Sequence, residues 1–301
     1  MAVVPFQKKI WTILDMLQWG TSYLAEKGFD ESRLTIELLL GHVLNLQRIQ
    51  LYTNFDKPLT EGELASFKGL LQRRLQHEPL QYIVGSTEFM GRKFAVDRRV
   101  LIPRPETEVV VEQAVRFVKE RFPGQAARVL EIGTGSGCIA VSLAAMIESI
   151  SVTAIDASPD AVQVAVRNAE ENGVGKKTIF AVKDLFKIAE ADFSFRFHLI
   201  VSNPPYVSQG QFAELQPEIR DFEPPLALTD DGDGLSFYRR IAHSGKQMLE
   251  PGGGIIVEHA FDQSESAKTI FADEGYREIE PFDDYDGNPR GLIAAEFLRS
   301  P

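Results

Sequence analysis

The sequence contains a single cysteine, Cys138, in 301 residues. One cysteine cannot form a disulfide within the chain, and it cannot by itself build a thiolate metal site. A chain without disulfides fits a reducing compartment, so we expect a cytoplasmic protein. The N-terminus lacks the uninterrupted apolar segment of a signal peptide, and no later stretch approaches the ~20 apolar residues that span a bilayer. We therefore expect no membrane association.

Basic residues are also scarce, because 32 lysines and arginines stand against 43 aspartates and glutamates, a formal net charge of -11 at pH 7. Proteins that bind a phosphate backbone usually present a basic face. The acidic balance favours a protein or small-molecule substrate over nucleic acid, although a local basic strip at Arg98 and Arg99 is compatible with it. Hydrophobic residues make up 44% and charged residues 25%, as in globular proteins, and a chain of this length favours two domains.

The first eighty or so residues predict a small helical bundle. Apolar residues recur at helical spacing over residues 11–24, and Ser32 is a candidate N-cap for a second helix. Thr60 and Glu63 form a capping box that opens a third helix. After the bundle, residues 89–94 surround a glycine turn and predict a β-hairpin.

From Arg128 onward, short β-branched segments alternate with amphipathic segments of helical length. The predicted strands are residues 129–132, 152–155, 179–182, 197–201 and 255–257. This alternation favours a parallel sheet with crossover helices. Such sheets bind their ligands at the carboxyl ends of the strands.

A glycine-rich turn follows the first of these strands, with the sequence Glu131-Ile132-Gly133-Thr134-Gly135-Ser136-Gly137. Glycine at a strand-to-helix turn lets the backbone approach a ligand closely. Asp156 ends the next strand, about twenty residues later, where a carboxylate can accept both hydroxyls of a ribose. Together these features predict a site for a nucleoside-containing cofactor.

The glycine spacing distinguishes between such cofactors. Dinucleotide-binding turns follow G-x-G-x-x-G, whereas the glycines here alternate behind the acidic Glu131, as in motif I of the S-adenosylmethionine methyltransferases. A carboxylate beside the turn suits the cationic methionine end of that cofactor and would repel a pyrophosphate. Asp184 and Leu185 follow the third strand, where they can contact the adenine or, for Leu185, simply belong to the core. We expect the cofactor to be bound by Glu131, Gly133, Thr134, Gly135, Ser136, Gly137, Asp156, Asp184, Leu185 and Asn203.

A second loop, Asn203-Pro204-Pro205-Tyr206, leaves the fourth predicted strand. Its two prolines fix the backbone and remove two N–H donors. The acceptors that remain, the Asn203 side-chain oxygen and the Pro204 carbonyl, suit the two donors of a planar NH2 group, and Tyr206 can stack on its plane. An amide nitrogen is a poor nucleophile, so the loop contributes positioning and electrostatics, and no metal is required.

Taken together, the two sites resemble those of the protein-(glutamine-N5) methyltransferases, and most closely the HemK/PrmC branch that modifies peptide chain release factors. The matching segments are residues 79–85, 89–94, 100–108, the glycine turn, 203–206 and 222–228. The run Pro103-Arg104-Pro105-Glu106-Thr107-Glu108 favours this branch over the related one that methylates a ribosomal protein glutamine. Glu131 departs from the family, because many relatives have Asp there.

The resemblance implies an α/β fold, with a Rossmann-like S-adenosylmethionine methyltransferase domain whose seven-stranded sheet is mostly parallel. We expect an N-terminal helical bundle over residues 1–85 that docks the release factor, a β-hairpin linker over 86–103, and the methyltransferase domain over 104–301. It also implies methyl transfer from S-adenosyl-L-methionine, leaving S-adenosyl-L-homocysteine. The acceptor would be the glutamine N5 in the Gly-Gly-Gln motif of class I peptide chain release factors.

Other classes of protein stay open at this point. An enzyme that methylates the amino group of a nucleic-acid base needs the same acceptors, and a flipped base would stack on Tyr206. The net charge and the lack of a basic recognition segment argue against it, and we expect no stable nucleic-acid partner. A non-catalytic protein that keeps the cofactor fold is a further alternative, against which the intact loop 203–206 argues.

Overall fold

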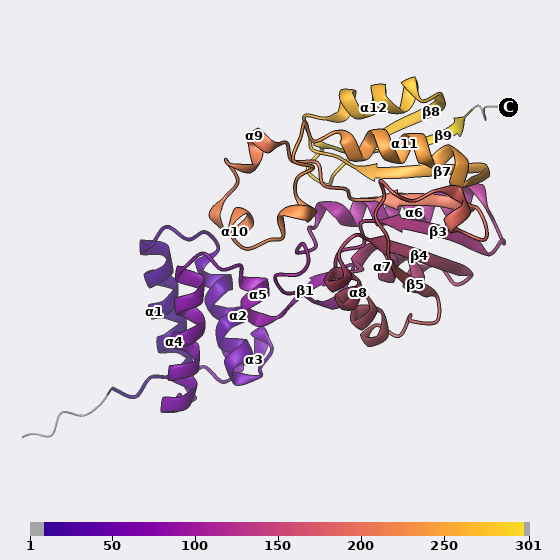
Figure 1. Cartoon of the computed structure of the whole chain (residues 1–301). Helices are drawn as coiled ribbons and strands as arrows, with labels where there is room; N and C mark the ends of the chain where they lie inside the picture. Colours follow the sequence, from indigo (N-terminus) through magenta and orange to yellow (C-terminus); the bar gives the residue numbers. More distant parts are fainter. Residues whose placement is uncertain (1–8, 298–301) are drawn as a thin grey trace, which may run out of the picture. The chain divides into compact units, whose positions relative to one another are not determined.

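The computed structural model describes residues 9–297, and the chain divides after Gly85 into two compact units (Figure 1). The N-terminal unit contains α1 (Ile13–Glu26), α2 (Ser32–Leu44), α3 (Arg48–Thr53), α4 (Glu61–Leu75) and α5 (Leu80–Val84). Apolar side chains from each of these helices meet in one core. Within residues 9–297, no helix combines the length and apolar character needed to cross a membrane.

The helix starts of this unit test two sequence predictions. The capping box is confirmed, because the Glu63 N–H donates to Thr60 Oγ1 at 3.2 Å and the Thr60 N–H donates to the Glu63 carboxylate at 2.7 Å. The prediction that Ser32 caps α2 is wrong. Glu31 occupies the cap position in a left-handed conformation, and Ser32 is the first helical residue. The Ser32 hydroxyl donates to the Phe29 carbonyl at 2.7 Å.

The second unit begins with the predicted hairpin, formed by β1 (Ser86–Phe89) and β2 (Arg92–Ala95). The remaining strands are β3 (Ala127–Ile132), β4 (Ile150–Asp156), β5 (Thr178–Val182), β6 (Phe197–Ser202), β7 (Leu249–Glu258), β8 (Tyr276–Asp283) and β9 (Pro289–Phe297). The longer helices are α6 (Glu106–Arg121), α7 (Cys138–Met146), α8 (Pro159–Glu171), α11 (Ser236–Met248) and α12 (Ser264–Asp273). Two short helices, α9 (Gln209–Phe212) and α10 (Pro217–Arg220), lie in the long connection between β6 and α11.

In the described part of the chain, one seven-stranded sheet has the order β5-β4-β3-β6-β7-β9-β8, and Figure 1 shows its strands side by side. The strands β3 to β7 are parallel, whereas β9 is antiparallel to both of its neighbours. The expected mostly parallel sheet is confirmed. Side chains alternate between two cores, so that Leu199 and Val201 pack with α6 and α7 while Ile200 packs with α11 and α12. Helices therefore cover both faces, and the carboxyl ends of the parallel strands are left to form a site.

Candidate active site

The glycine-rich turn connects β3 to α7 at the carboxyl edge of the sheet. The N–H groups of Gly133 and Thr134 donate to the Ile155 carbonyl at 2.9 and 3.1 Å, which fixes the turn to the end of β4. Gly133, Gly135 and Gly137 have φ angles of 75°, 52° and 80°. Side chains with a Cβ rarely adopt this left-handed conformation, so the turn favours glycine at all three positions.

The three glycines nevertheless have different surroundings. A Cβ added at Gly135 would meet no atom within 4 Å, and one at Gly133 would meet only the Asn203 carbonyl oxygen at 3.9 Å. A Cβ at Gly137 would lie 3.0 Å from the Cβ of Ala165 in α8. Gly133 and Gly135 therefore leave room for a ligand, whereas Gly137 allows α7 and α8 to pack closely.

A cavity of about 360 Å³ opens beside this turn. Of the predicted site residues, those that line it are Gly133, Gly135, Asp156, Asp184, Leu185, Asn203 and Pro205. The predicted residues outside the lining are Glu131, Thr134, Ser136, Gly137, Pro204 and Tyr206. The structure thus brings residues from the ends of four strands around one hollow of the size that small-molecule ligands occupy.

Asp156 joins two walls of the cavity. Its Oδ2 atom accepts the Gly135 N–H and its Oδ1 atom accepts the Ser158 N–H, each at 2.9 Å. Burial raises the pKa of the Asp156 carboxyl, while these N–H groups favour its ionised form. The carboxylate is held in one orientation, and each oxygen keeps a lone pair for a ligand hydroxyl.

The opposite wall is apolar. Leu185 is buried, and the half-exposed ring of Phe186 meets the ring of Phe237 edge to face at 5.1 Å between centroids. Asp184 stands at the rim, where its Oδ1 atom accepts the Phe186 N–H at 2.9 Å. The Lys187 ammonium, paired with Asp184 at 2.9 Å, lowers the pKa of that carboxyl. An apolar cavity wall with one hydrogen-bond acceptor at its edge suits a heteroaromatic ring that bears an amino group.

Glu131 lies behind the turn. It is buried, and its Oε2 atom accepts the Thr134 hydroxyl at 2.6 Å. Its Oε1 atom is buried without a hydrogen-bond partner among the described residues. Burial raises the pKa of Glu131 to about 8, so the side chain is mostly neutral at pH 7. A direct contact between Glu131 and the cofactor stays a prediction.

The loop 203–206 lies at the end of β6. The Ser202 hydroxyl donates to the Ile132 carbonyl at 2.7 Å, and the Asn203 Nδ2 atom donates to the Thr107 hydroxyl at 3.1 Å. The Tyr206 carbonyl accepts a hydrogen bond from the Gln263 side-chain amide at 2.8 Å. The Tyr206 hydroxyl lies 3.4 Å from the Glu258 carboxylate. The loop is thus held from β3, α6 and the segment before α12.

Sequence reasoning did not find how two other segments close the cavity. Residues 99–101 line one side and Pro224 with residues 226–227 line another. Arg104 pairs with the buried Glu223, which also accepts the Ile102 N–H at 3.2 Å, so an ion pair joins the two segments. Both segments were noticed as family motifs, but their pairing across about 120 residues leaves no local signal.

Asp230 and His198 are two conspicuous polar residues whose side chains bond within the protein. Asp230 accepts the N–H groups of Gly232, Gly234 and Ser236 at 2.9 to 3.1 Å, and so forms the turn that opens α11. His198 is buried near the amino end of β6, where its Nδ1 atom accepts the Arg128 N–H at 2.9 Å.

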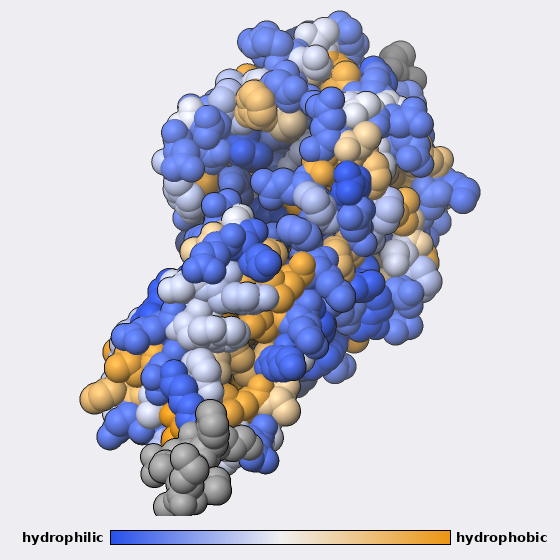
Figure 2. Space-filling view, turned by 90° about the vertical axis from the view of Figure 1, so that its left-hand side faces the viewer, coloured by the Kyte–Doolittle hydropathy of each residue, from blue (hydrophilic) through white to orange (hydrophobic). Residues whose placement is uncertain are grey.

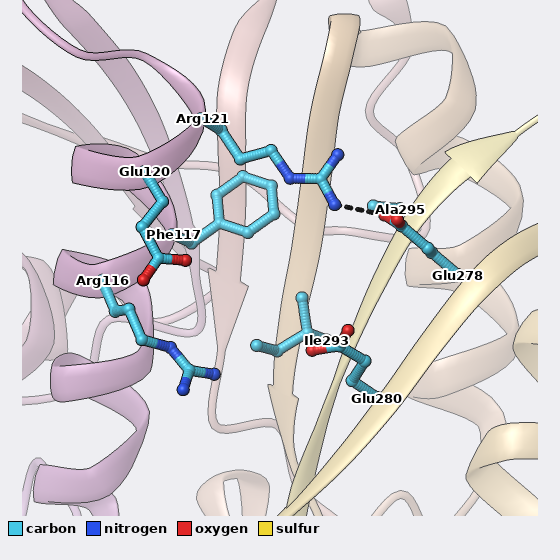
Figure 3. A pocket seen from close by; sticks show the side chains of 8 residues that line it. All are labelled: Arg116, Phe117, Glu120, Arg121, Glu278, Glu280, Ile293 and Ala295. Atoms are coloured by element: carbon cyan, nitrogen blue, oxygen red, sulfur yellow. Dashed lines mark hydrogen bonds and ion pairs between the residues drawn. The ribbon is translucent and has the colours of Figure 1, made fainter.

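A second, smaller hollow of about 100 Å³ lies between α6 and the strands β8 and β9 (Figure 3). Arg116 and Glu120 project from α6 toward it, and Arg121 forms an ion pair with Glu278 across it. None of the predicted site residues lines this hollow. We therefore assign this hollow no part in the site.

Comparison with known proteins bears on the same two units. Residues 15–85 match the PrmC N-terminal domain, and residues 108–219 match the Methyltransferase small domain. A release factor glutamine methyltransferase of Geobacter sulfurreducens is 46% identical over 89% of this chain and 91% of its own length. Another, from Chlorobaculum tepidum, is 41% identical over 95% of this chain and 98% of its own length.

Among solved structures, the hMettl16 catalytic domain has a TM-score of 0.55 with 16% identity, over 81% of this chain and 86% of that one. This likeness concerns the fold alone. The family, in contrast, follows from the two bacterial relatives, whose identity to this sequence extends over both units. The chain belongs to the release factor glutamine methyltransferases.

Proposed function

We propose that this enzyme transfers a methyl group from S-adenosylmethionine to the side-chain nitrogen N5 of the glutamine in the Gly-Gly-Gln motif of class I peptide chain release factors. The observation that carries the proposal is that Asn203 lines the same cavity as Gly133, Gly135 and Asp156. An acceptor for an amide NH2 group therefore lies next to a nucleoside-sized hollow. The names of the relatives supply the class of substrate.

The residues around the cavity fit S-adenosylmethionine. The open space over Gly135 accommodates the methionine part, with Thr134, Ser136 and Gly137 holding the turn in shape. Asp156, Leu185, Phe186 and Asp184 line the cavity. Asp156 would accept the ribose hydroxyls, Leu185 and Phe186 would pack against the adenine, and Asp184 would accept its amine. When bound, this cofactor supplies a methyl group on a positively charged sulfur, an electrophile that a weak nucleophile can attack.

The chain's own contribution to the reaction is to orient the glutamine. The Asn203 oxygen and the Pro204 carbonyl each accept one N–H of the substrate amide, which directs its nitrogen toward the cavity. Pro204 and Pro205 keep these acceptors rigid because their rings fix φ. The gain is positional and electrostatic, and it is largest where water is excluded.

The N-terminal unit has a surface suited to a protein partner. Ile10, Ile49 and Phe55 are half or more exposed, and Trp19 stacks on Tyr23 at 5.2 Å between ring centroids. Figure 2 shows hydrophobic side chains at the surface of the part next to the grey N-terminal residues. Apolar side chains that gather at a surface can form a protein contact, so we propose that this unit docks the release factor.

The test is to incubate the enzyme with radiolabelled S-adenosylmethionine and one candidate substrate at a time. The candidates are a purified class I release factor, the same factor with its Gly-Gly-Gln glutamine changed to alanine, a ribosomal protein preparation, and DNA or RNA. Label should enter only the unmodified release factor. Label in the alanine variant, in ribosomal protein or in nucleic acid would assign a different substrate.

A further inference from the structure

Thr107 is a buried residue in the first turn of α6 that lies outside the cavity lining. Its side chain is close to the reacting loop, because the Asn203 Nδ2 atom lies 3.1 Å from the Thr107 hydroxyl oxygen. Thr107 is 2% exposed, so no solvent competes for that hydroxyl. The hydroxyl therefore has to find its second partner inside the protein.

Glu258 ends β7, and its carboxyl interacts with the Thr107 hydroxyl. It is 1% exposed, and the Tyr206 hydroxyl donates to its Oε1 atom at 3.4 Å. Its Oε2 atom is buried without a hydrogen-bond partner among residues 9–297. Burial raises the pKa of Glu258 to about 7, while the Thr107 hydroxyl, Arg290 and the Tyr206 hydroxyl favour the ionised form and Glu106 opposes it. The Thr107 hydroxyl is thus bonded to Asn203 and favours the ionised form of Glu258.

While the Glu258 carboxyl is ionised, the donors and acceptors around Thr107 have one consistent arrangement. An ionised carboxylate only accepts hydrogen bonds, and a hydroxyl has a single proton to donate. When Thr107 gives its proton to Glu258, it must accept a proton from Asn203. The Asn203 NH2 group is then engaged with Thr107, and the Asn203 oxygen is left for a ligand.

This orientation matters because the two ends of an asparagine amide have nearly the same shape but opposite roles. Turned over, Asn203 would present its NH2 group to the NH2 group of the substrate, and two donors would face each other. We propose that Thr107 and Glu258 are positioning residues that hold the Asn203 amide with its oxygen toward the substrate nitrogen. This inference rests on the proposed function of Asn203.

The test compares two changes at Thr107 with one matched control. Thr107→Val keeps the shape and removes the hydroxyl, Thr107→Ser keeps the hydroxyl, and Thr178→Val removes a similarly buried hydroxyl that bonds the Val174 carbonyl away from the cavity. In single-turnover methylation with saturating cofactor, Thr107→Val should lower the rate roughly 10-fold to 100-fold. Thr107→Ser should restore most of it, and Thr178→Val should match the wild type. Cofactor affinity, measured by calorimetry, should stay within about 2-fold in all three.

A second readout needs no turnover. The side-chain NH2 resonances of Asn203, assigned by NMR through their loss in Asn203→Ala, should shift in Thr107→Val and in Glu258→Gln but not in Thr178→Val. Glu258→Gln should also slow methylation, because a glutamine amide can donate to Thr107 and so reverse the direction of the hydrogen bonds from Glu258 to Asn203. This variant keeps the inference testable if Thr107→Val does not fold. Wild-type rates and unshifted Asn203 resonances in Thr107→Val or Glu258→Gln would overturn it. A wild-type enzyme that methylates no release factor would instead overturn the proposed function, while the NMR shifts would still decide the orientation of Asn203.

Discussion

At the scale of single residues, Asn203 has the most direct part in the proposed reaction. Asn203→Ala removes the acceptor that orients the substrate NH2 group and leaves the Pro204-Pro205 turn in place. We expect kcat to fall ~10²-fold or more, as when one preorganised polar contact is lost from an active site. Single-turnover methylation measures this, with thermal unfolding to check the fold. Near-wild-type turnover would remove Asn203 from the reaction.

Tyr206→Phe provides the comparison within the same loop. The ring is what stacks on an amide plane, and the hydroxyl makes only a long contact of 3.4 Å with Glu258. We expect this change to lower kcat much less than Asn203→Ala does, in the same assay. The proposal that the loop 203–206 orients the substrate nitrogen is wrong if Tyr206→Phe lowers kcat more than Asn203→Ala does.

Asp156→Ala tests the cofactor side. A charge-assisted hydrogen bond to a ribose hydroxyl is worth ~1.5 to 3 kcal/mol, so affinity for S-adenosylmethionine should fall about 10-fold or more. The change also removes the two carboxylate oxygens that accept the Gly135 and Ser158 N–H groups. Calorimetry measures the affinity, with Asp160→Ala as an exposed carboxylate control outside the cavity. Unchanged affinity in a folded Asp156→Ala variant would exclude this carboxylate from the site.

Sequence reasoning identified residues whose role follows from their own chemistry and position in a motif. It therefore found Gly135, Asp156 and Asn203, which line one cavity. It missed the contact of Thr107 with Asn203, because that contact joins residues 96 positions apart. It also treated Glu131 as a charged group, since burial and the resulting rise of its pKa to about 8 are properties of the fold.

At the scale of elements, the hairpin is fastened to the cofactor turn through one asparagine. The Asn168 side chain is fully buried in α8, accepts the Ala95 N–H at 2.8 Å, and donates to the Ala95 carbonyl at 3.0 Å and the Ser136 carbonyl at 2.8 Å. Asn168→Ala leaves these backbone groups without a partner, so we expect a loss of about 2 to 4 kcal/mol in unfolding free energy.

Urea unfolding measures this loss. The control is Asn172→Ala, which removes a half-buried side chain that donates to the Lys93 carbonyl at 3.0 Å, and it should cost less than about 1 kcal/mol. Equal losses in the two variants would show that Asn168 has no special role in joining the hairpin to the turn.

The elements that sequence reasoning predicted are those with a strong local pattern. The strands β3, β4 and β6 are mostly apolar and almost wholly buried, because parallel strands are buried on both faces. β8 was not predicted, since this edge strand is partly exposed and reads as a polar segment. β9 was not predicted either, although its residues 292–295 are apolar and buried. The helices α3 and α5 have only 6 and 5 residues, too few to show a helical period.

At the scale of the whole molecule, the buried Glu131 couples stability to pH. Its pKa rises from the ordinary 4.5 to about 8 on folding, so between these values the folded protein keeps a proton that the unfolded chain releases. Stability should fall as pH rises through this window. Glu131→Gln cannot release a proton, so its unfolding free energy relative to wild type should increase by roughly 1 kcal/mol per pH unit. Urea unfolding at about pH 5 and about pH 8 measures it, and a difference independent of pH would contradict it.

The two units also predict a division of labour. A fragment that begins at Ser86 keeps the glycine turn, Asp156 and Asn203, so it should bind S-adenosylmethionine with near-wild-type affinity. Its methylation of intact release factor should be strongly reduced, because the proposed docking unit is absent. Calorimetry and methylation rates test the two expectations, and full-rate methylation by the fragment would contradict the docking role.

In the proposed reaction, the nitrogen placed at Asn203 belongs to the glutamine of the release factor's Gly-Gly-Gln motif. The most direct measurement is tandem mass spectrometry of a purified class I release factor after incubation with this enzyme and S-adenosylmethionine. We expect a mass increase of one methyl substitution on that glutamine, which is absent when Asn203→Ala replaces the wild-type enzyme. A methyl group on any other residue, or none on the release factor, would contradict it.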